Sequence, residues 1–395
     1  MTKDRFKKKM FVIALLFTTL TMMAETPLTP ASDILYKTFS NTAAVDLLLS
    51  IPTLIAMFSS IIFGFLMLKI NKKYILTFGV VCYCVGGICG HLIDSLAFMI
   101  GMRAIIGIGL GACNVSAIAI AADQSETEEE RQKLTSYITA GISISAMLLT
   151  FLAGQLTNTF GWQSVFTLYW SGIPMLILVI LFVPRTAPSL SISEDASETD
   201  SSSEIKKIRI LPFSLQMLLE FFWFLTYGVV FFQISVYLSD CNIGNAALAG
   251  SMSSLTNLVA FFSSLAFPHF YRKYKYAGSF IHYLALCVGY IILWIFRTPA
   301  TVIIACILLG YGFGYSLSFF SIHLGQLVPR SKSSIAATAY SAIMGIGMFM
   351  STFTVSALKR LLHTDSITDL LPYIILAAFI GTVCSLAVKL LEEKK

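Results

Sequence analysis

Residues 97–122 read AFMIGMRAIIGIGLGACNVSAIAIAA and contain a single charged side chain, that of Arg103. A helix needs about 20 mostly apolar residues to cross the hydrocarbon core of a bilayer, which is about 30 Å thick. The apolar residues of this stretch are continuous, whereas the strands of a membrane barrel alternate between apolar and polar residues. The stretch is therefore predicted to form a transmembrane helix.

Comparable stretches fill most of the chain. Of its 395 residues, 56% are hydrophobic and 12% are charged, whereas about a quarter of the residues of a soluble domain are charged. This composition excludes a soluble enzyme, a disordered protein and a secreted disulfide-bonded scaffold. The predicted spans are residues 10–32, 45–68, 74–93, 97–122, 134–156, 163–184, 212–238, 246–267, 277–296, 300–323, 334–358 and 371–390. The predicted fold is an all-α integral membrane protein with twelve transmembrane helices.

Few residues suggest chemistry at a metal or a cofactor. Seven of the eight cysteines lie inside apolar stretches, and no spacing of Cys and His typical of a metal site is present. The chain also lacks the motifs of a phosphate-binding loop and of a nucleophile elbow. We therefore expect no metal, no cofactor and no enzymatic activity, and the net charge of +6 requires no nucleic-acid partner.

The basic residues predict the orientation of the chain in the membrane. If the N-terminus is cytoplasmic, 22 of the 27 Lys and Arg residues lie on the cytoplasmic side of the predicted spans. The cytoplasmic loops of membrane proteins carry such an excess of basic residues. We therefore expect a multi-pass protein of the cytoplasmic membrane with both termini in the cytoplasm.

The predicted spans fall into two halves. Residues 185–210 are rich in Ser, Asp and Glu and are predicted to form a cytoplasmic linker between residues 1–184 and residues 211–395, each with six spans. Three glycines of the fourth span recur 203 positions later in the tenth: Gly107, Gly109 and Gly111 correspond to Gly310, Gly312 and Gly314. A repeat at a constant offset indicates duplication, so we predict two pseudo-symmetric six-helix bundles.

The loop after the second span resembles a signature of the major facilitator superfamily, whose fold pairs two six-helix halves around a central cavity. Residues 64–73 read GFLMLKINKK, and the family pattern is G-x-x-x-D-R-x-G-R-R. Gly64, Lys69, Lys72 and Lys73 match the first glycine and three of the basic positions, whereas Leu68 occupies the position of the family's Asp. The fold implied by the resemblance is the predicted one.

Further matches lie in the fourth, first and fifth spans. The fourth span is similar to the family pattern R-x-x-x-G-x-G, and residues 20–30, LTMMAETPLTP, resemble the signature of the twelve-span drug:proton antiporter branch. The antiporter pattern expected in the fifth span is mostly absent, because Leu149 and Thr150 occupy its Gly-Pro positions and only Gly154 agrees. The resemblance implies conformational or structural roles for Gly64, Lys69, Lys72, Lys73, Gly107, Gly109, Pro27, Pro30 and Gly154.

Glu25 and Arg103 are predicted to form the proton-coupling site, and Glu25 also to contact the substrate. Helical spacing places Thr18, Thr21 and Glu25 on one polar face of the first span, and a carboxylate inside the membrane can exchange a proton for a cationic substrate. Arg103 lies at a comparable depth and can tune that carboxylate. In the alternative interpretation, Glu25 is solvated or caps a kink at Pro27, and Arg103 reaches the headgroups.

Aromatic and polar side chains are predicted to bind the substrate. Glu220, Trp223, Tyr227 and Phe231 share one face of the seventh span, and an acid beside aromatic rings can hold a lipophilic cation by charge and cation–π contact. The alternative is a lipid-facing aromatic stripe. Other predicted contacts are Tyr311 and Tyr315 of the tenth span and Asn114 of the fourth, for which hydrogen bonding between helices is the alternative.

Together these residues predict a secondary transporter that works by alternating access. We expect proton-coupled efflux of a small amphipathic or cationic compound. The alternatives are an importer or facilitator of a small metabolite, and a membrane sensor that transports nothing. The expected partners are a small-molecule substrate, protons and the lipid bilayer, and the chain is expected to act as a monomer.

Overall fold

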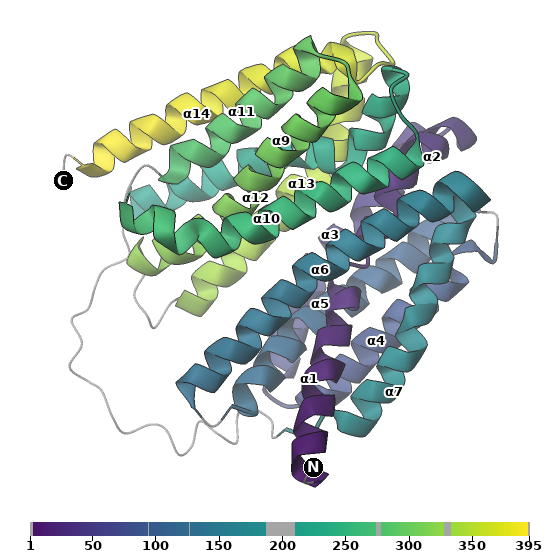
Figure 1. Cartoon of the computed structure of the whole chain (residues 1–395), viewed down its shortest axis with the longest axis vertical. Coiled ribbons are helices and arrows are strands. Elements are labelled where there is room, and N and C mark those ends of the chain that lie inside the picture. The colour runs from purple at the N-terminus through teal and green to yellow at the C-terminus, as the bar shows by residue number, and fades with distance from the viewer. Residues whose placement is uncertain are drawn as a thin grey trace. The chain divides into compact units, whose positions relative to one another are not determined.

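The computed structural model describes residues 3–93, 95–125, 127–186, 210–273, 278–327 and 333–393, which form helices and connections without a β-strand (Figure 1). Most of the predicted linker, residues 187–209, lies outside the described residues. The long helices of the first half are α1 (Lys3–Met22), α3 (Thr42–Leu66), α4 (Lys72–Ile88), α5 (Leu96–Asp123), α6 (Glu128–Phe160) and α7 (Gly172–Phe182). Those of the second half are α9 (Ile210–Asp240), α10 (Ala246–Lys273), α11 (Gly278–Ile295), α12 (Pro299–Leu327), α13 (Ser333–Leu361) and α14 (Leu371–Glu393).

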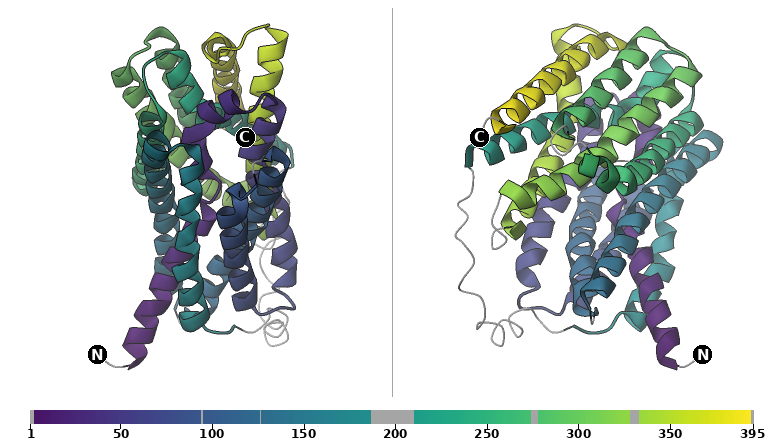
Figure 2. Two further views of the ribbon diagram at one scale, coloured as in Figure 1. Left: turned by 90° about the vertical axis from the view of Figure 1, so that its right-hand side faces the viewer. Right: turned by 60° about the vertical axis from the view of Figure 1, so that its left-hand side comes forward.

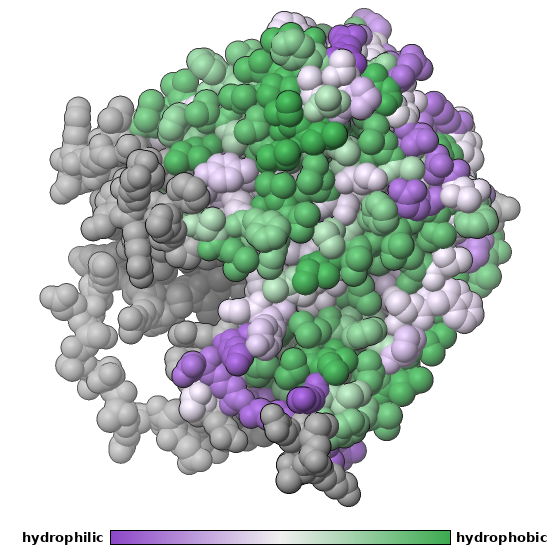
Figure 3. All heavy atoms as spheres, in the orientation of Figure 1, coloured by the Kyte–Doolittle hydropathy of each residue, from purple (hydrophilic) through white to green (hydrophobic). Residues whose placement is uncertain are grey.

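The helices are long and apolar enough to cross a membrane. Within the described residues, eleven helical segments meet both conditions, and α11 adds a shorter apolar helix, Phe280–Ile295, at the ninth predicted span. Large apolar side chains such as Phe65, Leu181, Phe262 and Phe379 are exposed. Figure 3 shows hydrophobic side chains over most of the coloured surface on the face seen. The predicted twelve-helix membrane fold is confirmed.

The first span is not the continuous helix that the sequence predicted. Helix α1 ends at Met22, and the chain continues through the 3₁₀-helix η1 (Thr26–Ala31) into the short helix α2 (Ser32–Thr38). Pro27 and Pro30 lack the backbone N–H that would bond to the preceding turn, so the α-helix cannot run through them. Glu25 therefore lies in a break between two helices. The face predicted to be polar is interrupted there, and the hydroxyl of Thr21 packs 3.5 Å from the sulfur of Met175 in α7.

The chain forms two compact units. Of the described residues, the first unit takes those up to Leu28, Leu47–Leu149 and 163–186, and the second takes Thr29–Asp46, Thr150–Trp162 and 210–393. The division into residues 1–184 and 211–395 stays a prediction, and the two units differ from it by the segments Thr29–Asp46 and Thr150–Trp162. In the first unit α4 packs against α5 and α1 against α7; in the second, α12 packs against α10 and α11, and α9 against α13. Figure 2 shows these helices from two further sides.

A pair of serine hydrogen bonds between two helices is repeated in the two units. In the first, Ser59 of α3 donates a hydrogen bond to the carbonyl of Gly107 (3.3 Å) and Ser60 to that of Gly111 (3.4 Å), both in α5. In the second, the equivalent helices α10 and α12 are joined in the same way: Ser263 donates to the carbonyl of Tyr311 (2.8 Å) and Ser264 to that of Gly314 (2.9 Å). The glycines that revealed the repeat therefore mark matching helix crossings.

Candidate proton and substrate sites

Glu25 lies in the first unit, in the break between α1 and η1, and its side chain is partly exposed. Thr53 of α3 donates a hydrogen bond of 2.7 Å from Oγ1 to Oε2 of the Glu25 carboxylate. Pro52, one residue earlier, lies inside the same helix α3. A carboxylate held by one hydroxyl donor keeps acceptor positions for a proton or a cation.

Arg103 of α5 is buried, with 1% of its surface exposed, and it binds the backbone around this break. Its guanidinium donates to the carbonyls of Ala24 (3.2 Å) and Glu25 (3.0 Å) and to those of Leu48 (3.2 Å) and Leu49 (3.4 Å) in α3. The bond to Glu25 therefore goes to its backbone. Within the described residues, no ion pair joins the Arg103 guanidinium to the Glu25 carboxylate, although the two charges attract each other at longer range.

Tyr169 completes this arrangement. Its hydroxyl donates to the carbonyl of Ala24 (2.7 Å) and accepts a hydrogen bond from Arg103 (3.2 Å). Tyr169 is fully buried beside Tyr83, with ring centroids 5.1 Å apart. Sequence reasoning missed Thr53 and Tyr169, because their partners are set by packing between helices and no pattern in the sequence marks them.

Glu220 of α9 belongs to a buried polar cluster in the second unit. It is fully buried and accepts hydrogen bonds from Gln216 (3.2 Å) and from Ser316 of α12 (3.1 Å). The Nε2 atom of His282 in α11 lies 3.7 Å from Oε1 of Glu220. The carboxylate thus connects three helices, α9, α11 and α12. Gln216, His282 and Ser316 were not among the predicted site residues.

The predicted aromatic face of α9 exists, and most of it is buried. Trp223 and Tyr227 stack with ring centroids 5.0 Å apart, and Phe313 of α12 stacks on Tyr227 at 4.6 Å. Trp223 and Tyr227 expose 0% and 1% of their surfaces. Phe231 lies 6.4 Å from Tyr227 at the end of this stack. The stack packs inside the second unit and is not a lipid-facing stripe.

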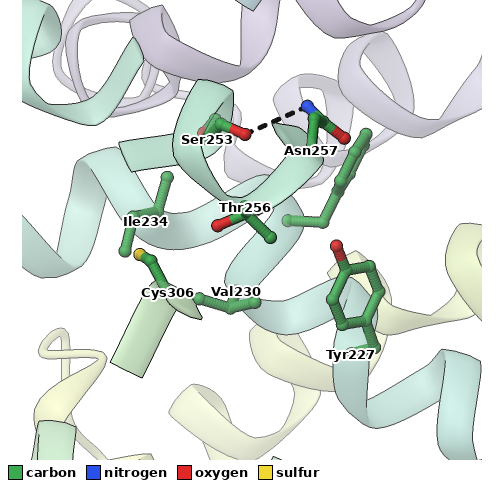
Figure 4. A pocket seen from close by; sticks show the side chains of 8 residues that line it. Tyr227, Val230, Ile234, Ser253, Thr256, Asn257 and Cys306 are labelled. Carbon is green, nitrogen blue, oxygen red and sulfur yellow. Dashed lines mark hydrogen bonds between the residues drawn. The ribbon is translucent and has the colours of Figure 1, made fainter. Parts of the chain in front are cut away.

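A pocket opens at the Tyr227 and Phe231 end of the stack (Figure 4). Asn257 and Thr256 of α10 give it two polar groups, and Figure 4 shows the bond of 3.0 Å from the Asn257 amide to the Ser253 carbonyl. The lining residues are Tyr227, Val230, Phe231, Ile234, Ser253, Thr256, Asn257 and Cys306. An apolar, aromatic wall with a few polar groups is typical of a site for a small amphipathic molecule.

The other predicted contact residues lie elsewhere. Tyr315 is buried in a cluster with Phe267 and Phe319, and Tyr311 packs against this cluster. Asn114 is half-buried in α5 of the first unit. The structure therefore brings Tyr227 and Phe231 together at one pocket, whose lining does not include Tyr311 or Tyr315 of the same unit.

The basic loop after α3 has an acidic partner, Asp123. Lys72 is buried at the start of α4, and its ammonium group donates to both carboxylate oxygens of Asp123, at 2.8 and 2.6 Å, at the end of α5. Lys73 donates to the carbonyl of Ile180 in α7 (2.8 Å), and Lys69 is exposed. A carboxylate from α5 thus stands beside the loop in which Leu68 replaces the family's Asp.

The predicted structural glycines and prolines occupy different environments. A Cβ atom on Gly107 would lie 2.7 Å from the carbonyl oxygen of Pro52, and one on Gly154 would lie 2.7 Å from Cα of Gly250. A Cβ atom on Gly109 would lie 2.5 Å from the carbonyl oxygen of Gly79 in α4, whereas one on Gly64 would have no atom within 4 Å. Pro27 and Pro30 are both buried in the region that interrupts the first span.

Asp46 is a buried carboxylate that sequence reasoning missed, because it lies at the edge of a predicted span. It accepts hydrogen bonds from the Tyr36 hydroxyl (2.5 Å) and from the hydroxyl of Ser356 in α13. All three residues belong to the second unit. Within the part of the chain that the structure describes, no three or more His, Cys, Asp or Glu residues are grouped to hold a metal ion.

Comparisons with known proteins agree with this architecture. The family model described as "Major Facilitator Superfamily" matches residues 5–352. A crystal structure of a POT family transporter in complex with 5-aminolevulinic acid has a TM-score of 0.79 at 11% identity and covers 99% of this chain and 96% of that chain. The crystal structure of a D-xylose-proton symporter has a TM-score of 0.72 at 15% identity, with 96% of each chain covered.

A curated relative matches a shorter region. Multidrug resistance protein MdtL of Escherichia coli O45:K1 (strain S88 / ExPEC) is 25% identical over 138 residues, which are 35% of this chain and 35% of that protein. The chain thus matches about a third of the length of the curated relatives. With the helices, the two units and the match over residues 5–352, the conclusion is that the chain belongs to the Major Facilitator Superfamily.

Proposed function

We propose that the chain is a proton-coupled exporter of small amphipathic or cationic compounds that works by alternating access. The observation that carries the proposal is the Glu25 carboxylate, which is partly exposed at a break in the first membrane helix and is held by the Thr53 hydroxyl. Placing an acidic residue inside a membrane span costs free energy, and such residues commonly serve a function. The partial match to multidrug resistance protein MdtL supports the direction of transport.

Glu25 and Arg103 have different parts in the proposed coupling. Glu25 takes up the proton, because its carboxylate is the group that can be neutralised. Arg103 is a positioning residue, since its guanidinium binds the Ala24 and Glu25 carbonyls and so fixes the break that presents the carboxylate.

We assign substrate contact to the pocket of the second unit. Tyr227 and Phe231 give an aromatic wall against which a lipophilic cation can lie, and Asn257 adds a polar group. Trp223 and Glu220 lie behind this wall in the proposed arrangement, where Trp223 supports Tyr227 by stacking and Glu220 joins α9 to α12 by accepting a hydrogen bond from Ser316.

Transport of labelled lipophilic cations into and out of proteoliposomes tests the proposal. With an imposed pH gradient, we expect the wild-type protein to move the cation against its gradient. Glu25→Gln is expected to reduce this movement to the level of protein-free vesicles, because the amide cannot take up a proton. The matched control is Asp33→Asn, which removes a carboxylate paired with Lys37 on the surface and is expected to leave transport unchanged.

Two results would contradict the proposal. One is full activity of Glu25→Gln. The other is wild-type export that persists after both the pH gradient and the membrane potential have been collapsed. Accumulation of a metabolite driven by the same gradient would support the alternative, an importer.

A further inference from the structure

The hydroxyl of Tyr227 differs from those of other buried tyrosines in the second unit. Tyr237 donates a hydrogen bond to the carbonyl of Leu293 (2.7 Å). Tyr290 donates one to the carbonyl of Thr226 (2.6 Å). Tyr227 is as deeply buried as Tyr290, with 1% of its surface exposed, but its hydroxyl has no hydrogen-bond partner among the described residues. Because buried polar groups in proteins are nearly always hydrogen-bonded, an unpaired hydroxyl on a pocket wall indicates a place for a ligand.

The ring of Tyr227 is held between two other aromatic rings. Trp223 stacks with it at a centroid distance of 5.0 Å and Phe313 at 4.6 Å. The ring cannot swing its hydroxyl toward a partner elsewhere in the unit without breaking both stacks. Figure 4 shows the Tyr227 hydroxyl pointing toward Asn257 of α10. The hydroxyl is therefore a donor with a fixed position on the wall of the pocket.

Asn257 supplies an acceptor to the same pocket. Its side chain is buried, with 9% of its surface exposed, and its amide nitrogen donates to the Ser253 carbonyl (3.0 Å). This bond turns the amide oxygen away from the carbonyl of Ser253, and within the described part of the chain no donor bonds to that oxygen. An amide oxygen can accept two hydrogen bonds. The pocket therefore has a buried donor and a buried acceptor, on α9 and α10, that are both open to a ligand.

The rest of the lining supplies mainly apolar surface. Val230, Phe231 and Ile234 form the wall from α9, and no Asp, Glu, Lys, Arg or His belongs to the eight lining residues. The hydroxyl of Thr256 is already used, because it donates to the carbonyl of Met252 (2.9 Å) in its own helix. An apolar wall with few, exactly placed polar groups fixes the orientation of a ligand through those groups. Recognition in this pocket therefore depends on hydrogen bonds to Tyr227 and Asn257.

We propose that this pocket selects amphipathic compounds that carry a hydroxyl group on an apolar or aromatic body. The hydroxyl of the compound accepts a hydrogen bond from Tyr227 and donates one to the Asn257 oxygen, while the body lies against Phe231. An ether can only accept, and a quaternary ammonium group can do neither, so such compounds leave a buried group unpaired. The inference rests on the proposed function, which takes this pocket as the substrate site, and it adds the class of substrate that is preferred.

Thermal unfolding of the full-length protein in detergent tests this proposal. The two probes are para-propylphenol and its methyl ether, para-propylanisole, which lacks the hydroxyl hydrogen. A compound that binds the folded protein raises the melting temperature as its concentration rises, and this dependence gives an apparent affinity. We expect the wild type to bind the phenol about tenfold more tightly than the ether. The ether is the more apolar probe and enters detergent micelles more readily, so micelles cannot produce this preference.

Three variants make the test specific. Tyr227→Phe keeps the stacked ring and is expected to bind both probes alike, with the wild-type melting temperature when no probe is present. The matched control is Tyr237→Phe on the same helix, which loses the bond to the Leu293 carbonyl. This control is expected to melt at a lower temperature but to keep the preference for the phenol. Asn257→Leu removes the acceptor and should also lose the preference.

Two results would overturn the inference: equal affinity of the wild type for the two probes, or a preference for the phenol that survives in Tyr227→Phe. The measurement uses no gradient, so it is independent of the transport test with Glu25→Gln. Equal probe affinities in a protein that exports lipophilic cations would refute this inference alone. A preference for the phenol that depends on Tyr227, in a protein that moves no compound, would refute the proposed function and keep the inference.

Discussion

At the scale of single residues, one guanidinium holds together the region around the proposed proton site. Arg103 donates to four backbone carbonyls and to the Tyr169 hydroxyl, which no shorter side chain with fewer donors can do. A break in a membrane helix exposes carbonyls that water cannot reach in the hydrocarbon region. Arg103 therefore stabilises the conformation in which Glu25 lies outside a helix.

Replacing this side chain should destabilise the protein although the charge is kept. The lysine in Arg103→Lys has three N–H donors on a single nitrogen. At least one of the carbonyls of Ala24, Glu25, Leu48 and Leu49 therefore loses the hydrogen bond that Arg103 donates. An unsatisfied buried group costs about 1–3 kcal/mol, and we expect the melting temperature in detergent to fall accordingly. The matched variant Arg297→Lys changes an exposed arginine and should leave it unchanged. Equal melting temperatures for the two variants would refute the anchoring role.

At the scale of helices, close crossings depend on glycine at some positions and not at others. Gly111 of α5 lies against α3, where an added Cβ atom would lie 2.6 Å from the Ala56 carbonyl oxygen and would collide with the Ser59 hydroxyl. A Cβ atom added to Gly64 of α3 would have no atom within 4 Å. The two residues lie in the same unit, so they form a matched pair.

We expect Gly111→Ala and Gly64→Ala to have opposite effects on stability. Gly111→Ala forces α3 and α5 apart, and overpacking of this kind costs about 1–3 kcal/mol. Gly64→Ala is expected to stabilise α3 by about 0.5–1 kcal/mol, because alanine loses less conformational entropy in a helix than glycine does. Thermal unfolding of both variants in detergent is the measurement. A larger loss of stability in Gly64→Ala would show that the crossing is not tightly packed.

The helices were predictable from the sequence to a far greater degree than the contacts of the sites. Continuous apolar stretches and the glycine repeat predict the twelve spans, because lipid permits few other structures. Pro27 and Pro30 indicate that the helix breaks near Glu25, but they do not predict the length of the break. The partner Thr53 could not be predicted, since it comes from another helix and packing decides which groups meet. Asp46 could not be recognised either, because a carboxylate at the end of a span is ordinarily solvated.

At the scale of the whole molecule, the distribution of basic residues predicts how the chain lies across the membrane. We expect fluorescent-protein fusions at the N-terminus, at the C-terminus and within residues 185–210 to be active, because these sites should be cytoplasmic. Alkaline phosphatase fused within residues 242–245, between α9 and α10, should be active on the opposite side. Phosphatase activity at the C-terminal fusion would contradict the predicted orientation.

The segment Thr29–Asp46 has a consequence for how the protein is made. Asp46 and its partner Ser356 are 310 residues apart in the chain. At a synthesis rate of about 5–20 residues per second, roughly 15–60 s pass between their emergence from the ribosome. During that interval the segment Thr29–Asp46 has not yet met its final partner in α13. The second unit is therefore completed by residues made near the start and near the end of translation, so its folding cannot finish before almost the whole chain has been inserted.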